Sequence, residues 1–368
     1  MRSGTVWQAA KRSIHHVTVS WGAALVTLLM FVPAVSGQDF PVSSQLPPES
    51  RQFDFWVGEW DVNLRVRQSD LTWTGRHRSV AKIYPILSGK AVLELWSEDQ
   101  VSGIKGYSLR YFDTARDEWV LWLNWPGPNR AGSSSLAGSF RHGRGDFYST
   151  SVGSDGTETI SRYSFNDITP TSLRWDDAYS TDGGETWTNR WIMEFSRTAA
   201  RPTLDLDGGP AHTFHEGDRC DAPEFRRYEF LSGRKNGEVI AGGSGAVTIT
   251  GHKILDGCAV LTFAGADGDP ERSWGFSHVT FNTYARRYEL TTLTSQPNTP
   301  VRMFYSRTPD ELVFYELSDT DEPVDRFRIE QDADGAVLWI HETPSGEDWL
   351  PVWGGRVQAE VDLSMPTS

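Results

Sequence analysis

A repeated segment places the strongest constraint on how this chain can fold. Ile86 to Trp96 reads ILSGKAVLELW, and a close copy returns at Ile254 to Ala264 as ILDGCAVLTFA. Ile, Leu, Gly, Ala, Val and Leu recur in the same order in both segments. Internal repetition indicates how many cores a protein builds, so the chain is predicted to use one structural unit twice.

Further matched segments follow the repeat in the same order and at a nearly constant offset. Gly106-Tyr107-Ser108 matches Gly275-Phe276-Ser277, and Gly184-Glu185-Thr186-Trp187 matches Gly346-Glu347-Asp348-Trp349. A chain of 368 residues is long enough for about two domains of ordinary size. We therefore expect two domains of the same kind.

The fold class follows from short alternating or apolar runs that are cut by Gly, Asp, Asn and Pro. Many short strands with frequent turn signals predict an all-β sandwich or barrel. Closing an antiparallel sheet of about eight to ten strands removes its exposed edges and leaves an interior that can hold a small ligand. The sequence thus predicts two tandem antiparallel β-barrels.

A single β-propeller is the alternative. Ser180 to Trp187 (STDGGETW) fits the Asp-box pattern SxDxGxxW of sialidase-like propellers. A propeller needs a similar blade every 40 to 50 residues or so. The much longer spacing of the two copies favours barrels.

The composition along the chain divides it into segments. Arg2, Lys11 and Arg12 precede an apolar run from Trp21 to Val32 and small residues up to Gly37, a pattern typical of a secretory signal. We expect a secreted or periplasmic protein with no stable membrane span after cleavage. The expected segments are 1–37 signal peptide, 38–52 linker, 53–197 barrel 1, 198–224 interdomain linker, 225–361 barrel 2 and 362–368 tail.

Charge and cysteine content narrow the partners. The formal net charge of −14 argues against nucleic acid, because neutralising phosphates requires a basic surface. The two cysteines, Cys220 and Cys258, could pair in an oxidising compartment, or Cys258 could be a small buried residue where the first copy has Lys90. Both interpretations stay open at this stage.

The first copy begins with the segment FDFWVGEWDV, Phe53 to Val62, which contains Gly58-Glu59-Trp60, a G-x-W at the start of the first strand. In this feature it resembles lipocalins and related calycins. Two further segments, GKAVLELW (Gly89 to Trp96) and DGGETW (Asp182 to Trp187), make it similar to a bacterial family of lipocalin-like domains of unknown function, whose members show GCAVLEEW-like and DGGKTW-like segments. The resemblance implies that this Trp closes one barrel end under an Arg from a late strand, Arg190 or Arg197. The second copy departs from the pattern, with Gly233-Arg234-Lys235 in place of the G-x-W.

Candidate site residues lie in the predicted strands. Glu94 and Arg110 could form an internal pair that orients a polar head group or acts as acid or base, and His278 could shuttle a proton. Aromatic and amide side chains predicted to line a pocket are Trp96, Trp122, Asn124 and Trp125. For each residue the alternative is ordinary: outward solvated charges, a hydrogen-bonded histidine, and Trp side chains that only pack the core.

These features favour a binding protein for a small apolar or aromatic molecule. The alternative is a cofactor-independent enzyme, a hydratase, cyclase, lyase or isomerase, acting on a hydrophobic small molecule. Glycan recognition through exposed Trp is a third hypothesis. We expect no cofactor and no metal, since His212 and His215 form an HxxH without a standard zinc spacing or a helix to carry it.

Overall fold

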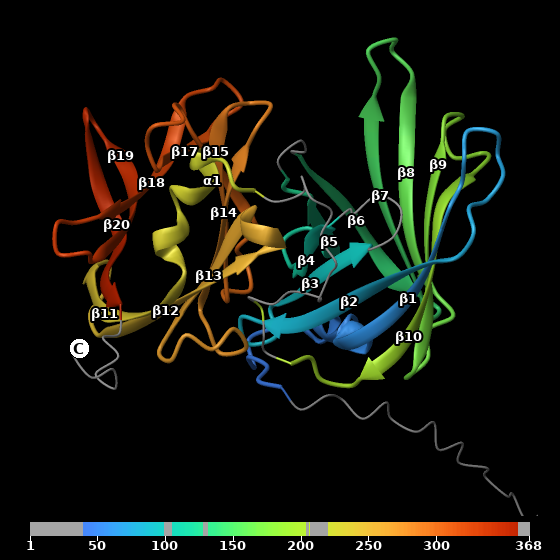
Figure 1. Ribbon diagram of the computed structural model, residues 1–368, viewed down its shortest axis with the longest axis horizontal. Coiled ribbons are helices and arrows are strands. Elements are labelled where there is room, and N and C mark those ends of the chain that lie inside the picture. The colour runs from blue at the N-terminus through green and yellow to red at the C-terminus, as the bar shows by residue number, and fades with distance from the viewer. Residues whose placement is uncertain (1–39, 99–104, 128–131, 204–205, 207–219, 360–368) are drawn as a thin grey trace, which may run out of the picture. The chain divides into compact units, whose positions relative to one another are not determined.

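A computed structural model shows an all-β protein made of two closed barrels (Figure 1). It describes residues 40–98, 105–127, 132–203, 206 and 220–359. Within these ranges each barrel contains ten antiparallel strands, and the one α-helix, α1(Pro223–Arg226), has four residues. The expected signal peptide, the tail and the HxxH of the linker lie outside the described residues.

Barrel 1 is formed by the first ten strands, which follow one another around the barrel. They are β1(Gly58–Val66), β2(His77–Ile86), β3(Ala91–Glu98), β4(Lys105–Asp113), β5(Glu118–Asn124), β6(Ser133–Arg141), β7(Arg144–Val152), β8(Glu158–Asn166), β9(Ser172–Ser180) and β10(Thr188–Ala199). Barrel 1 closes because β1 pairs with β10, for example Val62 with Phe195.

Barrel 2 repeats this arrangement in the same order. Its strands are β11(Gly233–Ala241), β12(Ala246–Ile254), β13(Ala259–Gly265), β14(Gly275–Asn282), β15(Arg287–Thr294), β16(Arg302–Ser306), β17(Val313–Leu317), β18(Pro323–Gln331), β19(Val337–Ser345) and β20(Asp348–Ala359). It closes by pairing β11 with β20. The prediction of two antiparallel barrels is confirmed, and the structure is not a propeller.

The Asp-box forms a hairpin turn between β9 and β10 of barrel 1. Asp182 accepts hydrogen bonds from the Thr186 backbone N–H at 2.9 Å and from the Ser180 hydroxyl at 2.6 Å. The indole of Trp187 donates to the Gly184 carbonyl at 3.0 Å. The motif is therefore a local turn that serves a barrel as well as a propeller blade.

Both copies of the repeated segment form the same unusual turn. Leu87, Ser88 and Gly89 have φ of 55°, 53° and 77°, and the matching residues 255–257 have φ of 52°, 59° and 84°. Three consecutive residues in the left-handed region are uncommon, and glycine accepts this conformation at the lowest cost. The run AVL that follows is buried in both barrels, in β3 and in β13.

A tryptophan closes one end of barrel 1. Trp60 on β1 is 1% exposed, and the guanidinium carbon of Arg197 on β10 lies 4.0 Å from its ring centroid. Arg197 also donates to the backbone carbonyls of Phe55 and Val57. Gly58 leaves room for this packing, because a Cβ there would lie 2.4 Å from Nη1 of Arg197. In barrel 2 the buried Lys235 takes the place of the Trp and donates to the Ser232 carbonyl.

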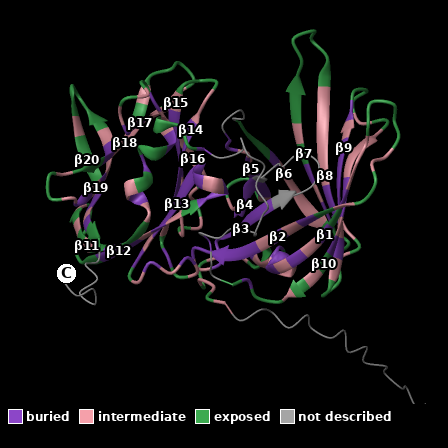
Figure 2. Cartoon of the chain, viewed as in Figure 1, coloured by how far each residue is buried: buried purple, intermediate pink, exposed green. Residues whose placement is uncertain are grey.

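The strands of barrel 1 that carry the repeat are buried on both faces (Figure 2). Residues such as Val92, Trp96 and Leu121 belong to the cluster inside barrel 1. Leu93 and Trp122, on the alternate face, share a second buried cluster with the core of barrel 2. Burial on both faces explains why β3 to β5 read as nearly continuous apolar runs in the sequence.

Specific contacts also connect the two barrels, which belong to one compact unit, Gly37–Ser368. The Lys90 ammonium donates to the carbonyl of Pro297 at 2.6 Å.

Cys220 and Cys258 form a disulfide, with their Cα atoms 4.9 Å apart. It ties the segment before α1 to the repeated turn of barrel 2. None of the helices in the described part of the chain is long and apolar enough to span a membrane.

Candidate functional site

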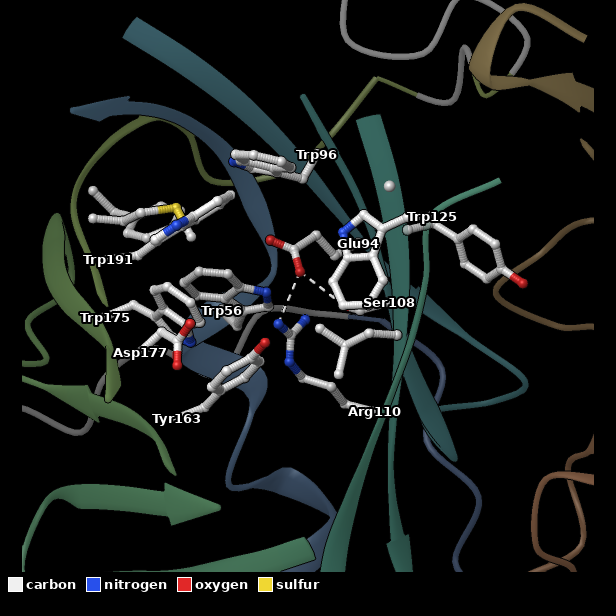
Figure 3. A pocket seen from close by; sticks show the side chains of 15 residues that line it. Trp56, Glu94, Trp96, Ser108, Arg110, Trp125, Tyr163, Trp175, Asp177 and Trp191 are labelled. Carbon is white, nitrogen blue, oxygen red and sulfur yellow. Dashed lines mark hydrogen bonds and ion pairs between the residues drawn. The ribbon is translucent and has the colours of Figure 1, made fainter. Parts of the chain in front are cut away.

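Barrel 1 contains a cavity of about 290 Å³. Its wall is mostly aromatic and is interrupted by a few polar groups that come from β3, β4, β8 and β9 (Figure 3). The lining residues are Trp56, Glu94, Trp96, Gly106, Tyr107, Ser108, Arg110, Leu123, Trp125, Tyr163, Trp175, Asp177, Trp191, Met193 and Phe195. An apolar cavity with a small number of convergent polar groups is the usual form of a small-molecule site.

The first polar group of the cavity is a buried ion pair. The Oε2 atom of Glu94 accepts hydrogen bonds from Nη2 of Arg110 and from the Ser108 hydroxyl, each at 2.8 Å. Only 10% of the Glu94 side chain and 5% of the Arg110 side chain are exposed. The pair forms because Glu94 on β3 faces Ser108 directly on β4, and Arg110 follows two residues later on the same face.

Aromatic rings surround the guanidinium of Arg110. Its central carbon lies 5.2 Å from the Trp56 ring, 5.5 Å from Phe53 and 5.4 Å from Phe165. Rings at this distance attract a cation through their quadrupole. The buried pair thus holds Glu94 with one oxygen fixed, and Figure 3 shows the Trp side chains gathered around its carboxylate.

The second polar group is Asp177 on β9. Its Oδ1 atom accepts a hydrogen bond from Arg190 at 2.8 Å, and burial raises the pKa of this carboxyl. Asp177 lies between Tyr163 on β8 and Trp191 on β10 in the strand register. Burial and the nearby carboxylate also raise the pKa of Tyr163, so its hydroxyl stays protonated near neutral pH. The cavity therefore presents two carboxylates and the phenol of Tyr163 to a ligand.

The predicted site residues divide into two groups in the structure. Glu94, Arg110, Trp96 and Trp125 line the cavity of barrel 1. Trp122 does not line it, because Leu123 and Trp125 on the alternate face of the chain do.

Asn124 and His278 also lie away from the cavity. Asn124 is buried, with 2% exposure, but contributes nothing to the lining. The ring of His278 is fully buried and packs 4.6 Å from the ring of Tyr107, on the face of β4 turned toward barrel 2. The structure thus brings Glu94 and Arg110 together and leaves His278 apart from them.

Sequence reasoning missed the half of the site that comes from β8 to β10. Tyr163, Trp175 and Trp191 complete the aromatic wall, and Asp177 adds the second carboxylate. A usable signal was present in the sequence. Trp175 and Asp177 alternate in one strand, and Trp191 corresponds to Trp353 of the second copy, because each lies four residues after the Trp of the matched GETW and GEDW segments. In the described residues, no group of three or more His, Cys, Asp or Glu could hold a metal ion.

Comparisons with known proteins show no family for this chain. No family model and no curated protein matches the chain. One similar solved structure is a protein of unknown function from the DUF3598 family of Nostoc punctiforme, with 9% sequence identity and a TM-score of 0.19. The match covers 86% of this chain and all of that one. The structure itself defines the chain as an all-β protein with two closed barrels.

Proposed function

We propose that barrel 1 binds a small aromatic or apolar molecule whose polar head lies against Glu94 and Asp177. The observation that carries the proposal is the cavity itself, with five Trp side chains in its wall and both carboxylates among its lining residues. Aromatic faces attract a cationic head through their ring quadrupole. Each carboxylate is paired with an arginine through one oxygen, Oε2 of Glu94 with Arg110 and Oδ1 of Asp177 with Arg190, so the head can bind at the other oxygen. An amine or a hydroxyl donor on a flat hydrocarbon body fits this description.

Two structural features support a calycin-type barrel that works outside the cytoplasm. The packing of Arg197 over Trp60 agrees with the lipocalin resemblance, in which a late-strand Arg covers the G-x-W tryptophan. The disulfide between Cys220 and Cys258 suits an oxidising compartment. Together with the signal-like N-terminal sequence, they favour a secreted or periplasmic binding protein.

Three probes of one shape test the proposal. Indan-2-amine, indan-2-ol and indane-2-carboxylate share a ring system and carry a cation, a neutral group and an anion near neutral pH. Isothermal titration of the full chain is expected to show binding of the amine, weaker binding of the alcohol and none of the carboxylate. Met193→Trp, which fills the cavity of barrel 1, is expected to remove the amine site. Amine binding that keeps its full affinity in a folded Met193→Trp protein contradicts the proposal.

A second candidate is a cofactor-independent enzyme acting in the same cavity. The observation in its favour is Asp177, a carboxyl whose pKa is raised by burial and which stands beside Tyr163 and opposite a fixed carboxylate. A base with a raised pKa is suited to proton abstraction. Under this hypothesis a bound ligand is hydrated, isomerised or cleaved, and Asp177→Asn stops the change. If NMR shows that the ligand is unchanged after prolonged incubation with the protein, the enzymatic hypothesis is refuted and only the binding function remains.

A further inference from the structure

Barrel 2 contains a cavity of its own, of about 200 Å³. Trp274, Trp339 and Trp353 provide its aromatic wall, and the rings of Trp274 and Trp353 meet edge to face at 5.3 Å. Thr262, Ser277 and His341 are among its polar lining. This cavity is smaller than that of barrel 1 and lies within a separate ring of ten strands.

The strand register shows that the two cavities are built on the same frame. In barrel 1, Asp177 pairs with Tyr163 on one side and Trp191 on the other. In barrel 2, His341 pairs with Phe327 and with Trp353 in the equivalent strands.

The other half of the frame corresponds in the same way. Glu94 faces Ser108 in barrel 1, and Thr262 faces Ser277 in barrel 2. The hydroxyls of Thr262 and Ser277 are hydrogen-bonded at 2.6 Å, where barrel 1 has the bond from Ser108 to Glu94. The equivalence therefore holds for backbone pairing and for side-chain contact.

The cavity wall of barrel 2 has neither of the two carboxylates found in barrel 1. Thr262 replaces Glu94 and His341 replaces Asp177, and no Asp or Glu is found among the lining residues of the second cavity. Val279, at the position of Arg110, is buried and apolar. The second cavity thus lacks the ion pair that dominates the first.

The cationic groups of the second cavity are already neutralised. Arg302 lines the wall, but its guanidinium is paired with Glu316 and Asp325. Nε2 of His341 lies 3.2 Å from the carboxylate of Asp325, and burial lowers the pKa of the imidazole, which is therefore neutral near pH 7. The imidazole also stacks on Phe327 with ring centroids 4.5 Å apart. A charged ligand would find no unpaired counter-ion here.

We propose that barrel 2 is a second binding site, specific for a small uncharged molecule with an aromatic or alicyclic body and one hydroxyl or carbonyl group. The Trp wall takes the body, and the hydroxyls of Thr262 and Ser277 with the imidazole of His341 bind the polar group. The inference rests on the premise of the proposed function that a barrel cavity of this chain takes a ligand. It differs from the proposed function in the barrel that binds the ligand and in the charge of that ligand.

The three indane probes separate the two sites. Native mass spectrometry of the full chain is expected to show two bound indan-2-ol molecules and one bound indan-2-amine. The Met193→Trp protein is expected to keep one alcohol site and to bind the amine there at least about tenfold more weakly, a difference of ~1.4 kcal/mol. Ala264→Trp places in barrel 2 the residue found at the matching position of barrel 1, Trp96, and is expected to remove this alcohol site.

Distinct outcomes overturn the two proposals. A folded Met193→Trp protein that binds no probe, or binds the amine as tightly as the alcohol, overturns the second site and leaves barrel 1 untouched. An Ala264→Trp protein that binds no amine overturns the proposed function of barrel 1. Where thermal unfolding shows that Ala264→Trp does not fold, Thr262→Val replaces it. Removing that hydroxyl is expected to weaken alcohol binding about tenfold, and unchanged affinity also refutes the second site.

Discussion

The two barrels share their strand order, their closing pairs and the left-handed turn of the repeat, yet they differ in nearly every polar group of their cavities. Barrel 1 holds Glu94 and Arg110 as a buried pair, whereas barrel 2 has Thr262 and Val279 at the same positions. The difference shows that turn geometry and register define the barrel. The residues that project from equivalent positions define what each cavity can bind.

The largest expected effect comes from breaking the ion pair of barrel 1. Arg110→Val gives barrel 1 the residue of barrel 2 and leaves Glu94 buried without its cation. Removing one partner of a buried pair costs about 3 to 5 kcal/mol, so the free energy of unfolding in urea is expected to fall by that amount.

A double variant sharpens the same comparison. Glu94→Thr combined with Arg110→Val copies the neutral solution of barrel 2 and is expected to recover most of the loss, because no charge remains buried. If the double variant is as unstable as Arg110→Val alone, the ion pair is not the cause of the loss. Val279→Leu, a small apolar change at the matching position, serves as the control and is expected to cost under about 1.5 kcal/mol.

The next effect is a pH dependence that arises from a buried histidine of barrel 2. His278 matches Leu109 of barrel 1, and burial lowers its pKa from the ordinary value of 6.5 to about 3. Between these pH values the unfolded chain takes up a proton that the folded protein does not. Its contribution therefore lowers the free energy of unfolding by ~1.4 kcal/mol for each pH unit as the pH falls through this window.

His278→Leu copies barrel 1 and removes this contribution. Denaturant unfolding of both proteins at a series of pH values measures the difference, which is expected to widen from pH 6.5 downwards. If the stabilities of the two proteins change in parallel with pH, the folded protein also accommodates a protonated His278, and the pH effect assigned to this residue is refuted. His252→Leu, a substitution elsewhere in barrel 2, controls for the loss of a histidine as such.

A smaller effect concerns ligand charge. Asp177→Asn keeps the shape of the barrel 1 cavity and removes one of its two negative charges. A hydrogen bond to a charged group is worth about 1.5 to 3 kcal/mol, so the affinity for indan-2-amine is expected to fall by roughly 10- to 100-fold, with little change for indan-2-ol. Equal losses for both probes in isothermal titration indicate a change of shape rather than of charge.

The smallest expected effect lies at the closed end of barrel 1. Arg197→Met removes the cation above Trp60 and its bonds to two backbone carbonyls, while keeping an apolar chain of similar length. A loss of roughly 1 to 2 kcal/mol in thermal or urea unfolding is expected. No loss at all means that Trp60 closes the barrel without the arginine.

The sequence allowed the fold to be predicted because the same local signals occur twice. The matched turns at Gly89 and Gly257 and the buried runs after them are properties of neighbouring residues, so they can be recognised without a structure. The orientation of β5 could not be predicted in this way. Both of its faces are apolar, since one packs inside barrel 1 and the other, with Trp122, belongs to the cluster shared with barrel 2.

The candidate site was predictable only in part, because local patterns do not show which face of a strand lines the cavity. Glu94 and Arg110 stand out as charges in adjacent apolar strands, and the structure pairs them. Asp177 is one of two consecutive aspartates, Asp176 and Asp177, and both are buried. Period-2 alternation places them on opposite faces but does not say which one faces the cavity. That choice depends on how all ten strands close.

Closure of each barrel through its first and last strands makes the order of its strands cyclic. In barrel 2 the register places Lys235 beside Ala359, so the chain enters and leaves the ring at neighbouring points. A permuted chain would have a short linker joining these two points and new termini in the hairpin around Gly346, between β19 and β20. Nine of the ten pairs of neighbouring strands would then be connected by a hairpin or by the linker. The tenth pair, β19 and β20, would be held by its hydrogen bonds alone. Barrel 2 is thus a natural candidate for circular permutation, in which its cavity is retained while its termini are moved to the opposite end of a hairpin.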